Sequence, residues 1–215
     1  MIGVVVGLEA EARIARTWAV TVAVGGGDAL GASKAASDLA ARPGITALIS
    51  FGLAGGLDPA LRPGDLLIPS TVVEGNDNWH PDPALCNALG GNTGHKLLGG
   101  GTLLATQAAK QVTRAMTGAH AVDLESAAVA RAAALHGLPF AALRAVCDHA
   151  GRSLPLAAVV ALDRSGRIGP FRILAAVLAR PWEIPALLGL AQDAAIASRA
   201  LKHRVRTTPG VNTWP

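Results

Sequence analysis

The sequence predicts an α/β fold, in which a mixed, mostly parallel central sheet is flanked by helices. Short runs rich in valine and isoleucine alternate with alanine-rich segments of helical pattern, which is typical of strands joined by crossover helices. The composition, 51% hydrophobic and 16% charged, is that of a globular protein. A length of 215 residues is enough for one sizeable core, and we see no internal repeat.

The first half of the chain alternates regularly between the two patterns. Strands are expected at residues 1–7, 20–27, 45–57 and 64–75, the last as one strand or a strand pair. A short helix is expected within 8–17, and a longer one within 28–42 with Asp28 at its N-cap.

The second half is less regular. Residues 76–100 are polar and rich in glycine and proline, which predicts a long loop over a site. A strand is then expected at 99–106, a strand end and a long helix closed by Gly137 at 121–137, and a last strand at 139–151. From Leu154 onward we expect two or three helices, separated by Pro170, Pro181 and Pro185.

We find no linker, so the whole chain, 1–215, is predicted to be one domain, with a core sheet and site in 1–151 and a helical part in 152–215. The charge is uneven: residues 1–150 carry ten basic and twelve acidic side chains, whereas residues 151–215 carry nine and three. This basic part is either a solvated surface or a face for an anionic partner. No zinc-finger spacing or aromatic RNA-binding pattern accompanies it, so we expect no nucleic-acid partner.

The first residues lack the basic start of a secretory signal, and the two cysteines form no CxxC pair. We therefore expect a cytoplasmic protein. The most apolar later stretch, "ILAAVLARPWEIPALLGLA", is interrupted by charges and prolines, so any membrane contact should be peripheral.

Standard catalytic signatures are absent: there is no GxSxG, no HExxH, no Walker A motif and no metal-ligand spacing, so neither metal nor organic cofactor is expected. The glycines Gly25, Gly26 and Gly27 lie between a strand and a helix, where they form either a turn or a cradle for an anion. Cys147 is best explained as a small buried residue.

Three carboxylates follow predicted strand ends or begin a helix: Glu11, Glu125 and Asp148. Each alone suits a surface, but ligands of open α/β sheets bind at the carboxyl ends of strands, where all three would converge. Cleavage of a glycosidic bond needs an acid for the leaving group and a base for the incoming water, and further carboxylates can hold ribose hydroxyls.

The motifs "IGVVVGLEAEA", "SFGLAGGLDPALRPGDLLIP" and "AVDLESAAVARAAALHGLPFAALRAVCDHAG" resemble the superfamily of purine nucleoside phosphorylases and methylthioadenosine nucleosidases. They cover residues 1–151. The remainder, including "SLPLAAVVALDRSGR" and "RPWEIPALLGLAQDA", is similar to the hopanoid-associated branch, whose members are thought to remove adenine from adenosylhopane.

The resemblance implies a role for each matching residue. Asp148 matches the acid that protonates the departing purine, and Arg144 matches an arginine that supports the site. Glu125 matches the glutamate that holds the ribose hydroxyls, Leu124 replaces a methionine under the sugar, and Glu11 matches the residue that activates water. Three further residues are expected to bind substrate: Asp123, Gly55 and Phe51. The residues expected near phosphate or water are Gly26, Gly27 and Ser50.

The sequence departs from the phosphorylases in the loop "SFGLAGG", where Ser50 and Leu53 stand at positions that often hold phosphate. Phosphate as a co-substrate and simple hydrolysis therefore both stay open. The residues after the acid, His149, Ala150 and Gly151, also differ, so base recognition is expected to differ in detail.

We thus expect an enzyme that splits the N-glycosidic bond of an adenosine derivative with an apolar tail, with adenosylhopane favoured. The alternatives are a methylthioadenosine or adenosylhomocysteine nucleosidase and a non-catalytic binding protein on the same fold. The resemblance implies a homo-oligomer, which we expect to be a homodimer.

Overall fold

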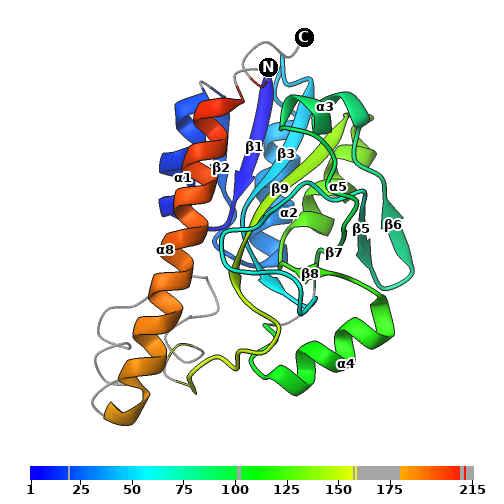
Figure 1. Cartoon of the computed structure of the whole chain (residues 1–215). Coiled ribbons are helices and arrows are strands. Elements are labelled where there is room, and N and C mark those ends of the chain that lie inside the picture. The colour runs from blue at the N-terminus through cyan, green and yellow to red at the C-terminus, as the bar shows by residue number, and fades with distance from the viewer. Residues whose placement is uncertain (19, 101–102, 157, 159–179, 209–210, 212–215) are drawn as a thin grey trace.

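The fold is built around one twisted sheet, seen in a computed structural model that describes residues 1–18, 20–100, 103–156, 158, 180–208 and 211 (Figure 1). The strands are β1 (Ile2–Val6), β2 (Thr21–Val24), β3 (Ala47–Gly56), β4 (Leu66–Leu67), β5 (Thr71–Glu74), β6 (Asp77–Trp79), β7 (Lys96–Leu98), β8 (Ala121–Val122) and β9 (Phe140–Asp148). The helices are α1 (Glu9–Ala15), α2 (Ala29–Ala40), α3 (Pro83–Ala88), α4 (Gln107–Thr117), α5 (Ser126–Leu135) and α8 (Ile184–Thr207), with short 3-10 turns at Arg16–Trp18 and Pro181–Glu183.

The sheet is mixed and mostly parallel, as predicted. Its strand order is β2-β1-β3-β8-β7-β5-β6, and β9 pairs with both β3 and β4. The long central strands β1, β3 and β9 run parallel, so their carboxyl ends lie at the same edge. They are almost entirely buried, which explains why they read as continuous apolar runs in the sequence.

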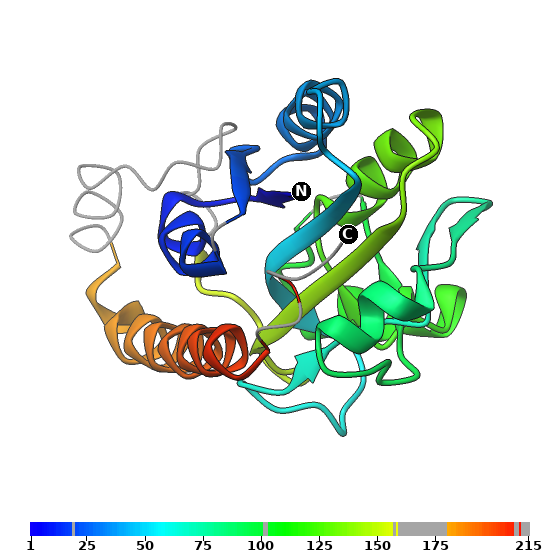
Figure 2. The same ribbon diagram turned by 90° about the horizontal axis from the view of Figure 1, so that it is seen from above.

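Helices cover both faces of the sheet. Helices α2 and α5 pack against one face, and α1, α3 and α8 pack against the other, so that each face has its own apolar core (Figure 2). Local signals fix the helix ends where the sequence predicts them. Asp28 accepts a hydrogen bond from the Gly31 N–H at the start of α2, and Gly137 follows α5 with φ +64°.

Three sequence predictions are wrong in detail. Residues 76–100 contain β6, α3 and β7, and α3 packs near the beginning of β9, because the Asp82 N–H donates to the Phe140 carbonyl. Helix α3 therefore lies at the end of β9 opposite Asp148, whereas β7 leads back towards the Asp148 end, since the Leu98 carbonyl accepts a hydrogen bond from the Asp123 N–H. The strand expected at 99–106 is replaced by an earlier one, because β7 ends at Leu98. The described residues between Leu98 and Gln107 lead into α4.

Pro185 does not separate two helices, contrary to the third prediction. It lies in the first turn of α8, where its missing N–H leaves no hydrogen bond unmade, so one helix runs to Thr207. Pro170 lies outside the described residues. Among the helices of the described part, none is both long enough and apolar enough to cross a lipid bilayer.

Candidate active site

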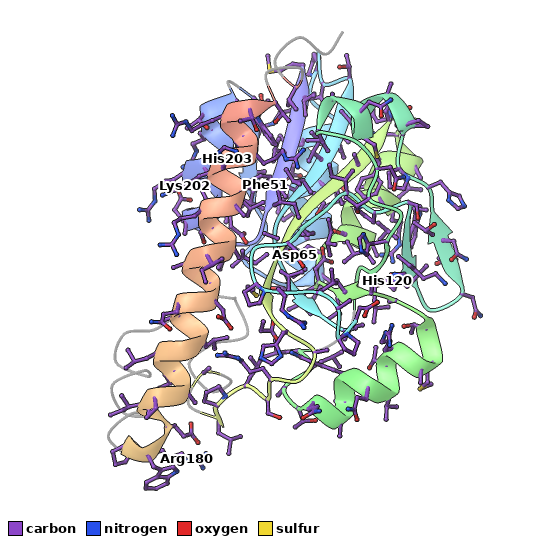
Figure 3. The ribbon with its side chains drawn as sticks, viewed as in Figure 1. Phe51, Asp65, His120, Arg180, Lys202 and His203 are labelled. Carbon is purple, nitrogen blue, oxygen red and sulfur yellow. The ribbon has the colours of Figure 1, made fainter. Side chains whose placement is uncertain are left out.

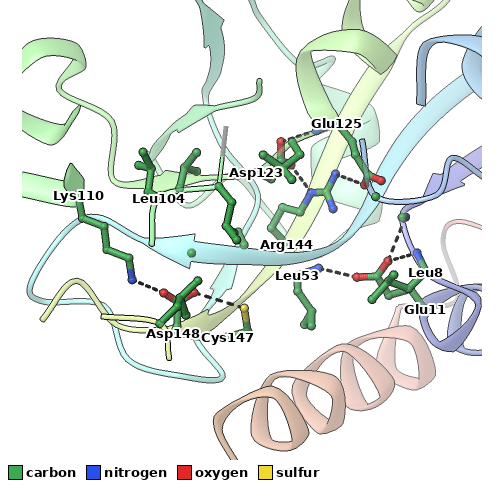
Figure 4. A pocket seen from close by; sticks show the side chains of 18 residues that line it. Leu8, Glu11, Leu53, Leu104, Lys110, Asp123, Glu125, Arg144, Cys147 and Asp148 are labelled. Carbon is green, nitrogen blue, oxygen red and sulfur yellow. Dashed lines mark hydrogen bonds and ion pairs between the residues drawn. The ribbon is translucent and has the colours of Figure 1, made fainter. Parts of the chain in front are cut away.

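A cavity lies at the carboxyl ends of the central strands, where β1, β3 and β9 end close together (Figure 4). Its charged lining residues are Glu11, Lys110, Asp123, Glu125, Arg144 and Asp148. Its other lining residues are Gly7, Leu8, Gly27, Leu53, Ala54, Gly55, Leu103, Leu104, Val122, Leu124, Cys147 and Leu154. The cavity thus combines a small set of converging charges with largely apolar walls, as ligand sites commonly do.

Glu11 is held by the backbone around it. Its Oε2 accepts hydrogen bonds from the N–H groups of Gly7 (3.0 Å) and Leu8 (2.9 Å), and its Oε1 accepts one from Leu53 (2.9 Å). Burial nevertheless raises its pKa, against the lowering effects of Arg144 and these three N–H groups. A carboxylate has about four acceptor positions, so the contacts made by the described residues leave one on Oε1 for a water molecule.

Arg144, which is fully buried in β9, pairs with two carboxylates of the site. Its Nε lies 2.5 Å from Asp123 Oδ2, and its Nη2 lies 3.4 Å from Glu125 Oε2. Nη2 also donates to the hydroxyls of Ser50 (2.5 Å) and Ser126 (3.2 Å). Burial alone would lower the pKa of Arg144, but the three surrounding carboxylates outweigh it and raise the pKa.

Asp123 supports the helix that carries Glu125. Its Oδ1 accepts hydrogen bonds from the N–H groups of Glu125 (3.1 Å) and Ser126 (3.0 Å), at the start of α5. This arrangement satisfies N–H groups that a helix start leaves free, and it sets the direction of the Glu125 side chain.

Glu125 is ready to bind a polar ligand group. Within the described part of the chain its Oε1 is buried and has no hydrogen-bond partner. Burial raises its pKa to about 7; Arg144 opposes this effect, and the nearby Glu11 and Asp123 add to it. A buried acceptor without a partner is costly, so a hydroxyl donor in the cavity would be favoured there.

Asp148 is the last residue of β9, and it is paired with a lysine that was not among the predicted site residues. Lys110, from α4, donates to Asp148 Oδ2 and, at 3.1 Å, to the His149 carbonyl. The thiol of Cys147 donates to Asp148 Oδ1 at 3.5 Å. Burial raises the pKa of Cys147 well above its ordinary value, with a smaller contribution from Asp148, so Cys147 is a neutral thiol.

The structure brings most of the predicted site residues together. Those that line the cavity are Glu11, Gly27, Gly55, Asp123, Leu124, Glu125, Arg144 and Asp148. Ser50 does not line the cavity; its hydroxyl accepts hydrogen bonds from Arg144 and Ser126.

Phe51 and Gly26 do not fit their predicted roles. Phe51 is fully buried in the core and packs edge-on against Trp18, with ring centroids 5.4 Å apart, so it does not line the cavity. The Gly26 N–H donates to the Gly7 carbonyl at 3.0 Å, and the Gly25 N–H donates to Val6 at 2.7 Å. These two amides hold β2 to β1 and are not free to bind phosphate.

Lys110 was not among the predicted site residues, because the sequence pattern favours a strand at 99–106 and gives no clear sign of the helix at 107–117. Apart from the apolar walls, Lys110 is the main new feature of the site. Among the described residues there is no cluster of three or more histidine, cysteine or carboxylate side chains arranged to hold a metal ion.

Comparison with known proteins assigns the chain to a family. The model of the phosphorylase superfamily matches residues 10–96 and again 96–179, most of the chain. No curated protein sequence matches the chain.

Several solved structures share the fold. S-adenosylhomocysteine nucleosidase from Streptococcus pyogenes has a TM-score of 0.71 at 16% identity, covering 100% of this chain and 97% of its own. The futalosine hydrolase of Helicobacter pylori has a TM-score of 0.67 at 16% identity, with 96% and 97% covered. A methylthioadenosine/S-adenosylhomocysteine nucleosidase from Colwellia psychrerythraea, in complex with adenine, has a TM-score of 0.65 at 17% identity, with 96% and 95% covered. At this level of identity these matches establish the fold, and the family match, which covers more than half of the chain, shows that this protein belongs to the phosphorylase superfamily of enzymes.

Proposed function

We propose that this enzyme hydrolyses the N-glycosidic bond of an adenosine-type nucleoside. The observation that carries the proposal is the placement of an acid and a base in one cavity. Asp148 lies on one side of Arg144, and Glu11 and Glu125 lie on the other (Figure 4). A nucleoside in this cavity would have its base beside Asp148 and its ribose between Glu11 and Glu125.

In this pose each carboxyl group has a separate task. Asp148 supplies a proton to the departing base while the bond to the anomeric carbon breaks. Glu11 takes a proton from the water that attacks that carbon, using the acceptor position left on Oε1. Glu125 Oε1 accepts a ribose hydroxyl, which would satisfy its missing hydrogen bond.

Charge favours water over phosphate as the nucleophile. The described lining residues include four carboxyl side chains but only two cations, Lys110 and Arg144. Both cations are already paired, with Asp148 and with Asp123 and Glu125. A phosphate dianion would therefore enter a site with no free positive charge among the described residues, which costs energy that a water molecule does not.

The apolar walls support a substrate with an apolar substituent on its sugar. Leucines from several segments, among them Leu8, Leu53 and Leu104, line the cavity. Together with the resemblance of the C-terminal part to the hopanoid-associated branch, they make adenosylhopane our favoured substrate. Methylthioadenosine is the second candidate, because structural neighbours with the same fold are nucleosidases of methylthioadenosine and adenosylhomocysteine.

Contact with a membrane and a homodimeric state stay predictions. The basic C-terminal end of α8, with Lys202 and His203, lies at the end of the helix opposite Arg180 (Figure 3). In Figure 1, α4, which carries Lys110 to the cavity, lies at the bottom of the view, whereas α8 ends at the top. A membrane contact made by the basic end of α8 would therefore lie at the other end of the molecule from α4.

The test is release of adenine from adenosylhopane and from methylthioadenosine, with and without phosphate, in water labelled with heavy oxygen. We expect release without phosphate and one labelled oxygen in the sugar product. Asp148→Asn and Glu11→Gln should each slow release by roughly 10²–10⁴-fold. A strict requirement for phosphate would replace hydrolysis by phosphorolysis. Absence of release from both substrates would favour a non-catalytic binding protein.

A further inference from the structure

Lys110 occupies an unusual position for a lysine. It is 1% exposed, and it is the one side chain that α4 buries, whereas its helix neighbours Gln111 and Val112 are exposed. Ordinary amphipathic helices bury apolar side chains instead. Taking an ammonium group out of water is costly, so a fold that buries this one needs partners for it.

Those partners are at the reactive end of the cavity. Within the described part of the chain, the Lys110 ammonium donates to Asp148 Oδ2 and to the His149 carbonyl. Because an ammonium group has three N–H bonds, these contacts leave one for a ligand. The start of α4 is fixed to the segment that follows Asp148. The Gln107 N–H donates to Ser153 Oγ at 3.1 Å, and the Leu154 N–H donates to the Ala105 carbonyl at 2.7 Å.

This pairing bears on the first step of the reaction. An ammonium group pairs most strongly with an aspartate in its carboxylate form, and a carboxylate has no proton of its own to give. In the same pair the proton needed by the leaving base is present on Lys110. Moving it to the carboxylate leaves a neutral amine beside a carboxylic acid, which has a proton to give to the base.

We propose, on the basis of the proposed function, that Lys110 is the proton source for departure of the base and that it acts through Asp148. One proton moves from Lys110 Nζ to Asp148, and Asp148 passes a proton to the base as the electrons of the glycosidic bond move onto it. Lys110 is left as a neutral amine. Glu11 takes one proton from the attacking water, and exchange with solvent returns a proton to Lys110, so charge and atoms balance.

A purely structural role for Lys110 predicts different behaviour. If the ion pair only held α4 in place, its loss would slow cleavage of every substrate in the same way. If Lys110 supplies the proton, its loss should matter only where the leaving group needs one. A para-nitrophenyl riboside provides the comparison, because nitrophenolate leaves as an anion without protonation.

The experiment compares wild type, Lys110→Met and Lys110→Arg on the adenosine-type substrate and on para-nitrophenyl riboside. We expect both variants to lose roughly 10²-fold or more on the adenosine-type substrate and to stay within about threefold on the riboside. Arginine keeps the positive charge but does not release its proton in proteins, so Lys110→Arg separates proton supply from charge. Asp148→Asn should show the same split, whereas Glu11→Gln should slow both substrates.

Lys110→Ala, assayed with added ethylamine, covers the case in which the larger variants disturb the fold. Recovery of adenine release with ethylamine supports the proposal. Wild-type rates in Lys110→Arg, equal losses on both substrates in folded Lys110→Met, or failure of ethylamine to restore folded Lys110→Ala would each overturn it. Wild-type enzyme that cleaves neither substrate would instead contradict the proposed function itself.

Discussion

Glu125 illustrates how a single buried carboxyl group links stability to binding. Its pKa is raised from the ordinary 4.5 to about 7, mainly by burial. Between these two values the folded protein keeps a proton on Glu125 that the unfolded chain has released. The folded state then binds more protons than the unfolded state, so the stability that this group contributes falls as pH rises through this window.

We expect the free energy of unfolding to fall by about 3 kcal/mol between pH 4.5 and pH 7 because of Glu125 alone. Glu125→Gln, which has no proton to release, should remove that part of the slope. Urea unfolding at several pH values in this range measures it as the difference between wild type and variant. Glu9→Gln, at an exposed carboxylate on α1 whose pKa is lowered by its hydrogen bond with Arg16, serves as the control and should leave the fall towards pH 7 in place. Parallel curves for wild type and Glu125→Gln would contradict the raised pKa.

The same group predicts the pH dependence of activity. In the proposed reaction the ionised form of Glu125 is the better acceptor for a ribose hydroxyl, and Glu11 must be ionised to take a proton from water. Burial raises the pKa of both groups. We therefore expect kcat/KM to decline below about pH 7 and not only below pH 4.5, as measured by adenine release across this range. Constant kcat/KM down to pH 5 would show that both carboxylates are ionised throughout.

At the scale of elements, the site depends on how closely the end of β1 approaches the start of α5. Gly7 follows β1, and a Cβ built on it would lie 2.6 Å from Glu125 Oε1. We expect Gly7→Ala to push this carboxylate away from the ribose position and to slow adenine release by roughly tenfold or more. Shortening the opposing side chain should relieve the clash, so Glu125→Asp should be less harmful in the Gly7→Ala background than alone. Additive losses, measured in a double-mutant cycle, would show that the two positions do not interact.

The elements also show what the sequence could and could not reveal. Strands β1, β3 and β9 were predicted because buried parallel strands leave continuous apolar runs, and α2 because of its Asp28 cap. Helix α4 was not predicted, since most of its residues are exposed and its one buried side chain is a lysine. Its position depends on contacts with residues 153 and 154, which are distant in the sequence. Because α4 was not predicted, its Lys110 was not recognised as the partner of Asp148.

At the scale of the whole molecule, the sequence placed the carboxylates well because the topology leaves little choice. Parallel strands bring their carboxyl ends to one edge, so residues that follow such strands converge whatever lies between them. The prediction for Phe51 is wrong for a different geometric reason. Side chains alternate along a strand, and the position of Phe51 in β3 directs its ring into the core, against Trp18.

Helix α8 ties the C-terminal part of the chain to this core. Its buried residues Ala197 and Leu201 pack on the apolar face that β9 shares with α1, and Val205 accepts a hydrogen bond from Trp18 Nε1 at 2.9 Å. The helix thus supports the strand that carries Arg144 and Asp148 without lining the cavity. Substitutions that disturb its packing should therefore change the stability of the fold more than the rate of the reaction.

Two leucines on α8 allow this separation to be tested with the same substitution. Leu201 is fully buried, whereas Leu188 is 62% exposed. We expect Leu201→Ala to lower the free energy of unfolding by about 2–5 kcal/mol, because it leaves a cavity in the core, and Leu188→Ala to change it by less than about 0.5 kcal/mol. Adenine release per folded molecule, measured well below both melting temperatures, should stay near the wild-type rate in each. Equal stability of the two variants would mean that α8 is not packed on the sheet as described. A large loss of activity in stable Leu188→Ala would instead mean that this exposed end of the helix takes part in substrate binding.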